Sequence, residues 1–445
     1  MSKKREEQSR PQYSGMGYDE VRSEATGYFR VEELDGVWWL IDPTGRCFFA
    51  IGTDHVNYHV HWCEKLGYAP YHRNVAARYG SESAWASSSV ERLKRWGFNA
   101  LGSRSSYHAR YQGLPHPENL RMGAAFARRA NIVPPTRWTG FPDVFSPEFE
   151  AFCDEFARER CTPHADDPWL LGWFIDNELE WHHWTTRGLL YSAMNKISGH
   201  PAKVGLVQLL RRRHPDAASF NAAWGTSLDD LSQLAQLPSV RPAATKAAEE
   251  DEAAFKRLVA ERYFSVTTGA IRRHDPNHLI LGFRFAGQAG HVWDIAGEHC
   301  DIVSVNCYRE LDVESGEFTD GFPEQLDQWH RQAQRPMMVT EWSFPALDAG
   351  LPCKHGGGQR VPTQTDRAKA FRTFQEYLFS RPYMVGSNYF MWADEPALGI
   401  SRRFPEDSNY GLVNVEDEPY EELTRAARDL NSRVCEIHRR STASD

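Results

Sequence analysis

The chain has 445 residues, a formal net charge of −9 and a hydrophobic content of 41%. These values exclude a mostly disordered or fibrous chain, and the negative charge gives no general attraction for the phosphates of nucleic acid. No apolar run reaches the roughly 18 residues that cross a membrane. We therefore expect neither a nucleic-acid nor a membrane partner.

The N-terminal twenty residues are charged and contain no apolar segment of the kind that marks a secretory signal peptide. The eight cysteines include no C-x-x-C pair, which is typical of buried thiols in a reducing compartment rather than of a disulfide framework. Both observations predict a cytoplasmic location.

In chain order, residues 1–25 are predicted to form a polar tail. A single folded domain is expected over 26–438, followed by a short tail over 439–445. The Asp35-Gly36 and Asp42-Pro43-Thr44-Gly45 turn signals separate the first short β-like runs and predict an N-terminal β-hairpin.

Eight apolar or aromatic runs follow, separated by longer amphipathic stretches. Because the runs do not alternate apolar with polar residues, they are typical of strands covered on both faces of a parallel sheet. The expected strands are 47–54, 98–103, 130–134, 170–178, 278–285, 301–308, 337–342 and 386–392. Eight strands that alternate with helices predict an α/β fold, a (β/α)8 or TIM barrel.

The longest irregularity covers residues 182–265, between the fourth and fifth expected strands. Segments such as VGLVQLLRRRH and FKRLVAERYF give it a helical character, and it is far longer than one crossover requires. We expect a helical insertion that lies over the barrel mouth.

Two glutamates follow apolar runs at the ends of the fourth and seventh strands, where a barrel carries its active site. Glu178 ends GWFIDNE, and Glu341 ends MVTE. A carboxylate after such a run is costly unless it is paired or functional. Strands four and seven lie on opposite sides of the ring, so the two acids can face each other. Two carboxyls about 5–5.5 Å apart are the machinery of a retaining glycosidase.

The two glutamates need opposite protonation states. A general acid must hold a proton at neutral pH, so burial or a neighbouring negative charge must raise its pKa, whereas a nucleophile must stay ionised. We assign Glu178 as acid/base and Glu341 as nucleophile. The alternative for Glu178 is a structural role, in which it caps a helix or pairs with an arginine.

The Asn177-Glu178 pair and Glu341 resemble the signature of the large clan of (β/α)8-barrel retaining glycoside hydrolases. More narrowly, the sequence resembles the β-agarase family (glycoside hydrolase family 50) and its β-galactosidase relatives. The stretches that carry this resemblance are DGVWWLIDPTGRCFFAIG, WGFNALGS, DVFSPEFEAF, GWFIDNELEW, FNAAWGTS, TEWSF and GLVNVEDEPYEEL, spread over nearly the whole chain.

The resemblance implies roles for three further residues. Asn177 would donate to the 2-hydroxyl of the sugar whose bond is cleaved, Tyr308 would hydrogen-bond Glu341, and Trp392 would form the flat floor under that sugar. Since neighbours in a strand face opposite sides, Asn177 and Glu178 both reach the site only if the strand end twists or bulges.

Other candidates surround these residues. Asp54 and His55 end strand one and Arg284 ends strand five, where polar side chains face the mouth, and Arg284 is suited to pair with a glutamate or bind a hydroxyl. Trp342 and Trp181 are expected to be stacking surfaces for further sugars.

The leading hypothesis is a retaining glycoside hydrolase that cleaves β-linked, galactose-containing oligosaccharides of the agarose type by double displacement. The alternatives are an exo-β-galactosidase or related β-glycosidase of the same clan, and a non-catalytic carbohydrate-binding barrel. An oligosaccharide is the expected partner. This chemistry requires no cofactor, and we expect no metal because the single E-x-x-H of Glu180 to His183 has no second copy.

Overall fold

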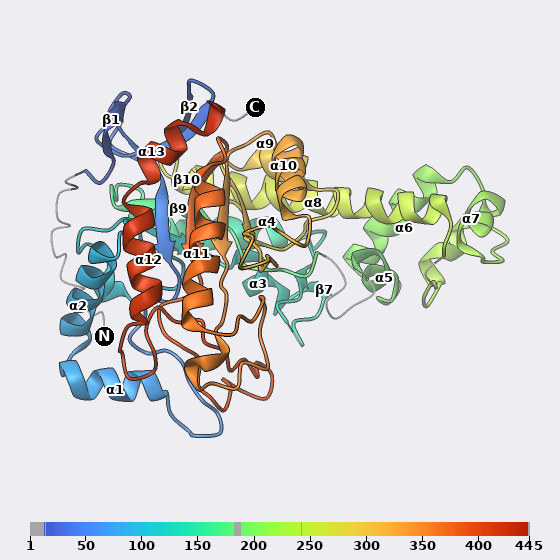
Figure 1. Ribbon diagram of the computed structural model, residues 1–445. Coiled ribbons are helices and arrows are strands. Elements are labelled where there is room, and N and C mark those ends of the chain that lie inside the picture. The colour runs from blue at the N-terminus through green and yellow to red at the C-terminus, as the bar shows by residue number, and fades with distance from the viewer. Residues whose placement is uncertain (1–12, 14, 137, 182–187, 242, 444–445) are drawn as a thin grey trace, which may run out of the picture.

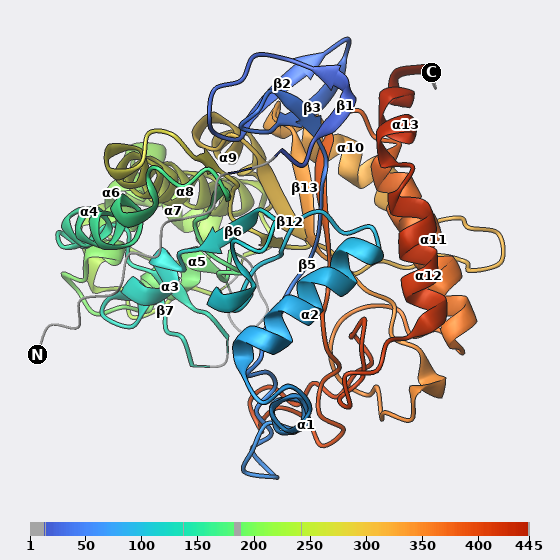
Figure 2. The same ribbon diagram turned by 90° about the vertical axis from the view of Figure 1, so that its left-hand side faces the viewer.

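The computed structural model describes residues 13, 15–136, 138–181, 188–241 and 243–443 (Figure 1). An antiparallel sheet precedes the barrel, with strands β1 (Tyr18–Arg22), β2 (Arg30–Leu34), β3 (Val37–Ile41) and β4 (Arg46–Phe48) in the order β1-β4-β3-β2. The predicted Asp35-Gly36 turn joins β2 to β3, with both residues at positive φ. Figure 2 shows this sheet at one end of the barrel and helix α1 (Pro70–Tyr79) at the other.

Strand β1 lies inside the stretch predicted to be a polar tail, so that boundary is wrong. It is the edge strand of its sheet and exposes charged side chains, which leaves no apolar signal in the sequence. One face of this antiparallel sheet packs onto the barrel. Phe29 and Leu40 on that side share a buried apolar cluster with the barrel residues Leu171 and Met338.

Parallel strands form the predicted TIM barrel. They are β5 (Ala50–Thr53), β6 (His116–Asn119), β9 (Leu170–Phe174), β10 (Leu279–Ile280), β11 (Phe285–Ala286), β12 (Val303–Asn306), β13 (Met337–Glu341) and β14 (Met384–Tyr389). Strands β10 and β11 are two halves of the fifth position, interrupted where Gly282 and Arg284 have positive φ.

The second barrel position is the segment 98–102, which hydrogen-bonds both of its neighbours without being a regular strand. The Asn99 and Ala100 amides donate to the Ile51 carbonyl, and the Leu101 amide donates to the Pro115 carbonyl. Since β14 pairs with β5, the ring closes through eight positions.

The third barrel strand was predicted wrongly. The barrel uses β6, with the sequence HPEN, whereas β7 (Asn131–Val133), inside the expected strand 130–134, pairs antiparallel with β8 (Phe141–Pro142). The polar side chains of β6 give no apolar signal, and the isoleucine and valine of β7 are apolar because they pack in the helix-covered core beside the barrel.

Helices surround the barrel. They are α1, α2 (Glu82–Arg95), α3 (Met122–Ala127), α4 (Phe149–Arg160), α8 (Lys246–His274), α9 (Trp293–His299), α10 (Phe322–Ala333), α11 (Gln364–Phe379), α12 (Glu421–Asn431) and α13 (Val434–Arg439). Short 3₁₀ turns complete the structure: η1 (Tyr107–Ala109), η2 (Thr162–His164), η3 (Leu231–Gln236), η4 (Leu347–Ala349) and η5 (Ser441–Ala443).

The expected insertion is helical, with α5 (Leu189–Met194), α6 (Pro201–Arg213), α7 (Ala217–Trp224) and the first part of α8. Its expected position is wrong: Figure 1 shows these helices extending sideways from the barrel. Helices α5, α6 and α7 all pack against α8, which holds them beside the barrel instead of across its mouth. Residues 182–187 lie outside the described residues.

Among the described helices, none combines the length and the apolar character that a membrane span requires. All eight cysteines are described and carry free thiols, seven of them buried.

Candidate active site

The carboxyl ends of the barrel strands surround a cavity of about 940 Å³. This volume lies near the upper end of the roughly 300–1,000 Å³ range of small-molecule pockets. Glu178 and Glu341 both line it, as do Asn177, Tyr308 and His55. The barrel therefore brings together the acids from its fourth and seventh strands, 163 residues apart in the chain.

Glu178 reaches the cavity through a turn in the backbone. The regular strand β9 ends at Phe174, and Glu178 has a φ of 52°, in the left-handed region. This departure from strand geometry lets the adjacent Asn177 and Glu178 both line the cavity. The Thr139 hydroxyl donates to the Glu178 carbonyl at 2.5 Å and holds the turn in place.

The Glu178 carboxyl lies in surroundings that favour its neutral form. Burial in the cavity wall, and then the negative charge of Glu341, raise the pKa of Glu178 well above its usual range. Among the described residues one donor reaches its side chain, the Asn306 amide at 3.0 Å from Oε1; it acts in the opposite direction and is outweighed. A carboxyl in this state holds a proton at neutral pH.

Glu341, the last residue of β13, has the opposite surroundings. Arg284 Nη2 donates to its Oε1 at 2.5 Å, and the Tyr308 hydroxyl donates to its Oε2 at 2.9 Å. The residue is 8% exposed, so both contacts act in a poorly hydrated environment. One full positive charge and one hydroxyl donor stabilise the ionised carboxylate.

Arg284 holds several site residues in place from beneath the cavity surface. Besides Glu341, its guanidinium donates to Asn177 Oδ1 at 2.6 Å and to Asp54 Oδ2 at 2.7 Å. Asp54 also accepts from the Ser103 amide at 2.9 Å. Both Arg284 and Asp54 are fully buried and neither lines the cavity, so the structure places them behind the cavity wall rather than in the substrate-contacting positions expected for them.

Asn306 is a site residue that sequence reasoning missed. Its amide donates to Glu178 Oε1 and, at 3.3 Å, to Asn177 Oδ1, and its own carbonyl accepts from Thr340 Oγ1 at 2.8 Å. It therefore links the end of strand four to the residue before Glu341. The one sequence signal that could have indicated this residue is its polar amide at the end of the otherwise mostly apolar run VSVN.

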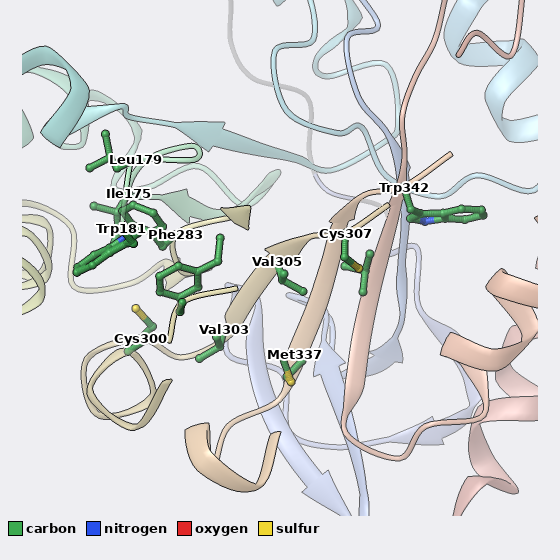
Figure 3. Close-up of a cluster of buried hydrophobic side chains, with 14 of the residues drawn as sticks. Ile175, Leu179, Trp181, Phe283, Cys300, Val303, Val305, Cys307, Met337 and Trp342 are labelled. Atoms are coloured by element: carbon green, nitrogen blue, oxygen red, sulfur yellow. The ribbon is translucent and has the colours of Figure 1, made fainter. Parts of the chain in front are cut away.

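The structure contradicts the stacking roles expected for two tryptophans. Trp342 is 1% exposed, packs on Phe371 and Phe374 of α11, and donates its indole N–H to Ser387. Trp181 is 2% exposed and stacks on Phe264 of α8. Figure 3 shows both side chains among the buried apolar residues of the core.

Strand alternation explains the position of Trp342. Because Glu341 faces the cavity, the next residue along the extended chain faces the helices outside the barrel. Trp181 comes three residues after Glu178, beyond the turn, and its ring lies in the apolar layer between the barrel and α8.

Trp392 is also not the floor of the cavity. It is fully buried, donates to the Tyr71 hydroxyl at 2.7 Å and packs against Trp85 and Trp96 outside the barrel. Strand β14 has already ended at Tyr389, and it is Phe390, followed by a cis peptide bond, that lines the cavity.

The aromatic wall around Phe390 includes residues from several loops. Its ring lies 5.3 Å from those of His55 and Tyr410 and 6.1 Å from that of Tyr308. On another part of the wall, Trp138 is half-buried and packs against Phe404 at 5.5 Å. Sugar-stacking surface is therefore available, although it comes from residues other than those predicted.

In the part of the chain that the structure describes, one group of side chains has metal-ligand geometry: Glu261, Glu298 and His299. None of these three residues lines the cavity, and both glutamates are exposed.

Comparison with known proteins agrees with the fold and with the predicted resemblance. The chain is 26% identical to Beta-agarase B of Vibrio sp. (strain JT0107), over 94% of this chain and 49% of that protein. The chain thus spans about half the length of this curated relative.

Two solved structures superpose over nearly the whole chain. A structure described as that of an exo-beta-agarase matches with a TM-score of 0.79 at 24% identity, covering 97% of this chain and 68% of the other. A second, described as an agarase, matches with a TM-score of 0.78 at 25% identity, covering 96% of this chain and 68% of the other.

A family model described as beta-galactosidase, glycoside hydrolase 42, matches residues 116–346. That region runs from β6 to the residues just after β13, so it includes both cavity glutamates. Because the match covers more than half of the chain, the chain belongs to this β-galactosidase family of glycoside hydrolases.

Proposed function

We propose that the protein is a retaining glycoside hydrolase that cleaves β-linked, galactose-containing oligosaccharides of the agarose type. The observation that carries this proposal is the contrast between two carboxyls in one cavity. Glu178 has a raised pKa, whereas Glu341 accepts from Arg284 and Tyr308. Retaining hydrolysis needs one protonated and one ionised carboxyl on either side of the bond that breaks.

In the first step, a Glu341 oxygen attacks the anomeric carbon as the glycosidic C–O bond breaks. The departing oxygen takes the proton of Glu178, which leaves a glycosyl ester on Glu341 and a carboxylate on Glu178. In the second step, Glu178 removes a proton from water, the water oxygen bonds to the anomeric carbon, and the ester bond to Glu341 breaks. The released sugar keeps its β configuration, and Glu178 is again protonated.

Family membership and the agarase relatives support the choice of a galactose-containing substrate. Beta-agarase B and the two agarase structures match over more than nine-tenths of this chain, and the family model is described as beta-galactosidase. The same description favours a second candidate, an exo-β-galactosidase. Product analysis on agaro-oligosaccharides and aryl β-galactosides distinguishes the two, because an exo-β-galactosidase releases only single galactose units, whereas the first candidate releases oligosaccharides.

Azide rescue tests the two roles separately. With an aryl β-galactoside, Glu178→Ala should still form the glycosyl ester, and azide should then give the β-glycosyl azide. Glu341→Ala should give the α-glycosyl azide, because azide enters on the face that the nucleophile occupied. Glu159→Gln, an exposed carboxylate on α4, is the matched control and should keep full activity without azide.

Two outcomes would contradict the assignment. One is Glu341→Gln cleaving the best substrate within about tenfold of the unmodified enzyme, which is only about 1.4 kcal/mol of transition-state stabilisation. The other is binding of the oligosaccharides without any product, which would favour the non-catalytic barrel.

A further inference from the structure

One wall of the cavity carries three arginines. Arg104 follows the second barrel position, Arg121 follows β6, and Arg128 follows the short helix α3. All three line the cavity and are exposed. They come from the second and third barrel positions, beside the fourth position that ends in Glu178. We call this group the arginine wall.

The three guanidinium groups have no partners in the part of the chain that the structure describes. Among the described residues, no hydrogen bond, ion pair or ring contact involves the side chain of any of them. Two other arginines near the cavity have partners: Arg284 binds two carboxylates through Nη2, although its Nη1 has none in the described structure, and Arg403 donates to the Pro135 and Trp138 carbonyls. The arginine wall differs from these two residues because none of its side-chain nitrogens has a partner among the described residues.

The members of the wall lie close enough to repel one another. Partial burial, followed by the charge of Arg104, lowers the pKa of Arg121, and the charge of Arg128 acts in the same direction. The opposing charge comes from Asp176, whose oxygens already accept from two backbone amides of α3 and from the Tyr263 hydroxyl. Like charges held together at a cavity wall form an anion-binding field.

The acids of the cavity do not neutralise this field. Burial and the charge of Glu341 raise the pKa of Glu178 and also that of Glu406, on which the charge of Arg104 acts in the opposite direction and is outweighed. Burial raises the pKa of Glu395 as well, well above its usual range. Glu341 itself is compensated by Arg284. The positive charge of the wall is thus available to a ligand.

A histidine next to the arginine wall also has a ring nitrogen without a hydrogen-bond partner among the described residues. His61 lines the cavity, is 8% exposed, and its Nε2 has no partner in the described structure. Burial and the charge of Arg104 lower its pKa to about 4, and its ring bonds the Ala393 carbonyl. Its neutral Nε2 is therefore an acceptor suited to a sugar hydroxyl beside the arginine wall.

We propose that the oligosaccharide bound in this cavity carries an anionic substituent, a sulfate ester or a carboxylate, which Arg104, Arg121 and Arg128 bind. This inference rests on the proposed function and narrows its substrate class to charged galactans. Planar guanidinium groups match both oxyanions, often through two parallel hydrogen bonds. A neutral agarose chain offers hydroxyls and ether oxygens, which do not compensate three adjacent positive charges.

Three oligosaccharides with one galactan backbone provide the test: a neutral one, its 6-O-sulfated form, and its form oxidised to a 6-carboxylate. We expect kcat/KM on at least one charged form to exceed that on the neutral form about tenfold or more. The charged form that is preferred identifies the substituent. The preference should decrease as salt is raised, since salt screens exposed charges.

Variants then locate the preference in the wall. Arg104→Gln combined with Arg121→Gln should lower the ratio of charged to neutral kcat/KM about tenfold or more. Arg129→Gln is the matched control, because this arginine follows Arg128 directly but lies over the Phe152 ring and does not line the cavity. The control should leave the ratio unchanged.

Equal or better cleavage of the neutral form, or an unchanged ratio in the double variant, would overturn the inference while leaving the proposed function intact. If none of the three is cleaved, the proposed function fails, and calorimetric binding of the same three compounds tests the wall alone. Tighter binding of a charged form that the double variant loses supports the inference, and equal binding of all three overturns it.

Discussion

The ends of the fourth and seventh barrel strands carry the same residue type in opposite environments. At the fourth, the backbone leaves strand geometry, and Glu178 receives one neutral donor from Asn306. At the seventh, β13 extends to Glu341, which receives a guanidinium and a phenol. The difference teaches that the surroundings of a carboxyl, its burial, its neighbouring charges and its donors, can give one residue type two different tasks.

Removing Arg284 should have the largest effect on this contrast. Arg284→Gln takes away the positive charge at Glu341 and leaves Asp54 buried without its partner. We expect kcat to fall about 10²–10³-fold, and the free energy of unfolding to fall by about 3–5 kcal/mol. Kinetics per folded molecule and a denaturant titration measure the two effects.

Arg367→Gln separates stability from chemistry. Arg367 is equally buried and joins α11 to the loop around Asn409, but it does not contact either glutamate. Its loss should cost stability with little change in kcat. An equal fall in kcat for both arginine variants would contradict a specific role for Arg284.

Tyr308→Phe should have a smaller effect on the same carboxylate. It removes one neutral donor to Glu341, and a hydrogen bond to a charged group is worth about 1.5–3 kcal/mol, so kcat should fall about 10–100-fold. Tyr377→Phe on α11 removes a hydroxyl that has no partner in the described structure and should leave kcat unchanged. A change in KM alone for Tyr308→Phe would show that Tyr308 binds substrate instead of Glu341.

Asn306→Leu changes the surroundings of Glu178, at the end of the fourth strand. Glu178 must be protonated to act as acid, so the rate falls as pH rises through its pKa. Because the Asn306 amide lowers the pKa of Glu178, its loss should move the alkaline limb of the pH profile to higher pH. Glu341→Gln should move the residual alkaline limb to lower pH, since the neighbouring negative charge is gone. The opposite shift in either variant would contradict the assignment of Glu178.

Trp342→Phe should have the smallest effect on catalysis. The indole lies outside the barrel and bonds Ser387, so we expect a loss of about 0.5–3 kcal/mol in stability and no change in KM for long oligosaccharides. Thermal unfolding and KM measured on the same preparation test this. A raised KM with unchanged stability would restore the stacking role that the sequence suggested.

Much of the site follows from local sequence signals, and the remainder depends on the turns at strand ends. Glu178 and Glu341 were predictable because each follows an apolar run, which fixes its place at the rim. The positions of the tryptophans were not predictable. A ring that follows a strand faces either the cavity or the outer helices, and a shift of one residue in the strand register changes which of the two it faces. Strand β6 was missed because HPEN has no apolar pattern. Arg121 was missed for the same reason, since its position at the cavity is set by that strand.

Trapping the covalent intermediate tests the central claim most directly. A 2-deoxy-2-fluoro-β-galactosyl fluoride, or the matching fluorinated oligosaccharide, slows the second step more than it hinders the first, so the ester accumulates. Peptide mass spectrometry should then find the sugar on Glu341, and Glu178→Gln should still become labelled. Attachment of the sugar to any other carboxylate would contradict the account, as would products released with inverted anomeric configuration.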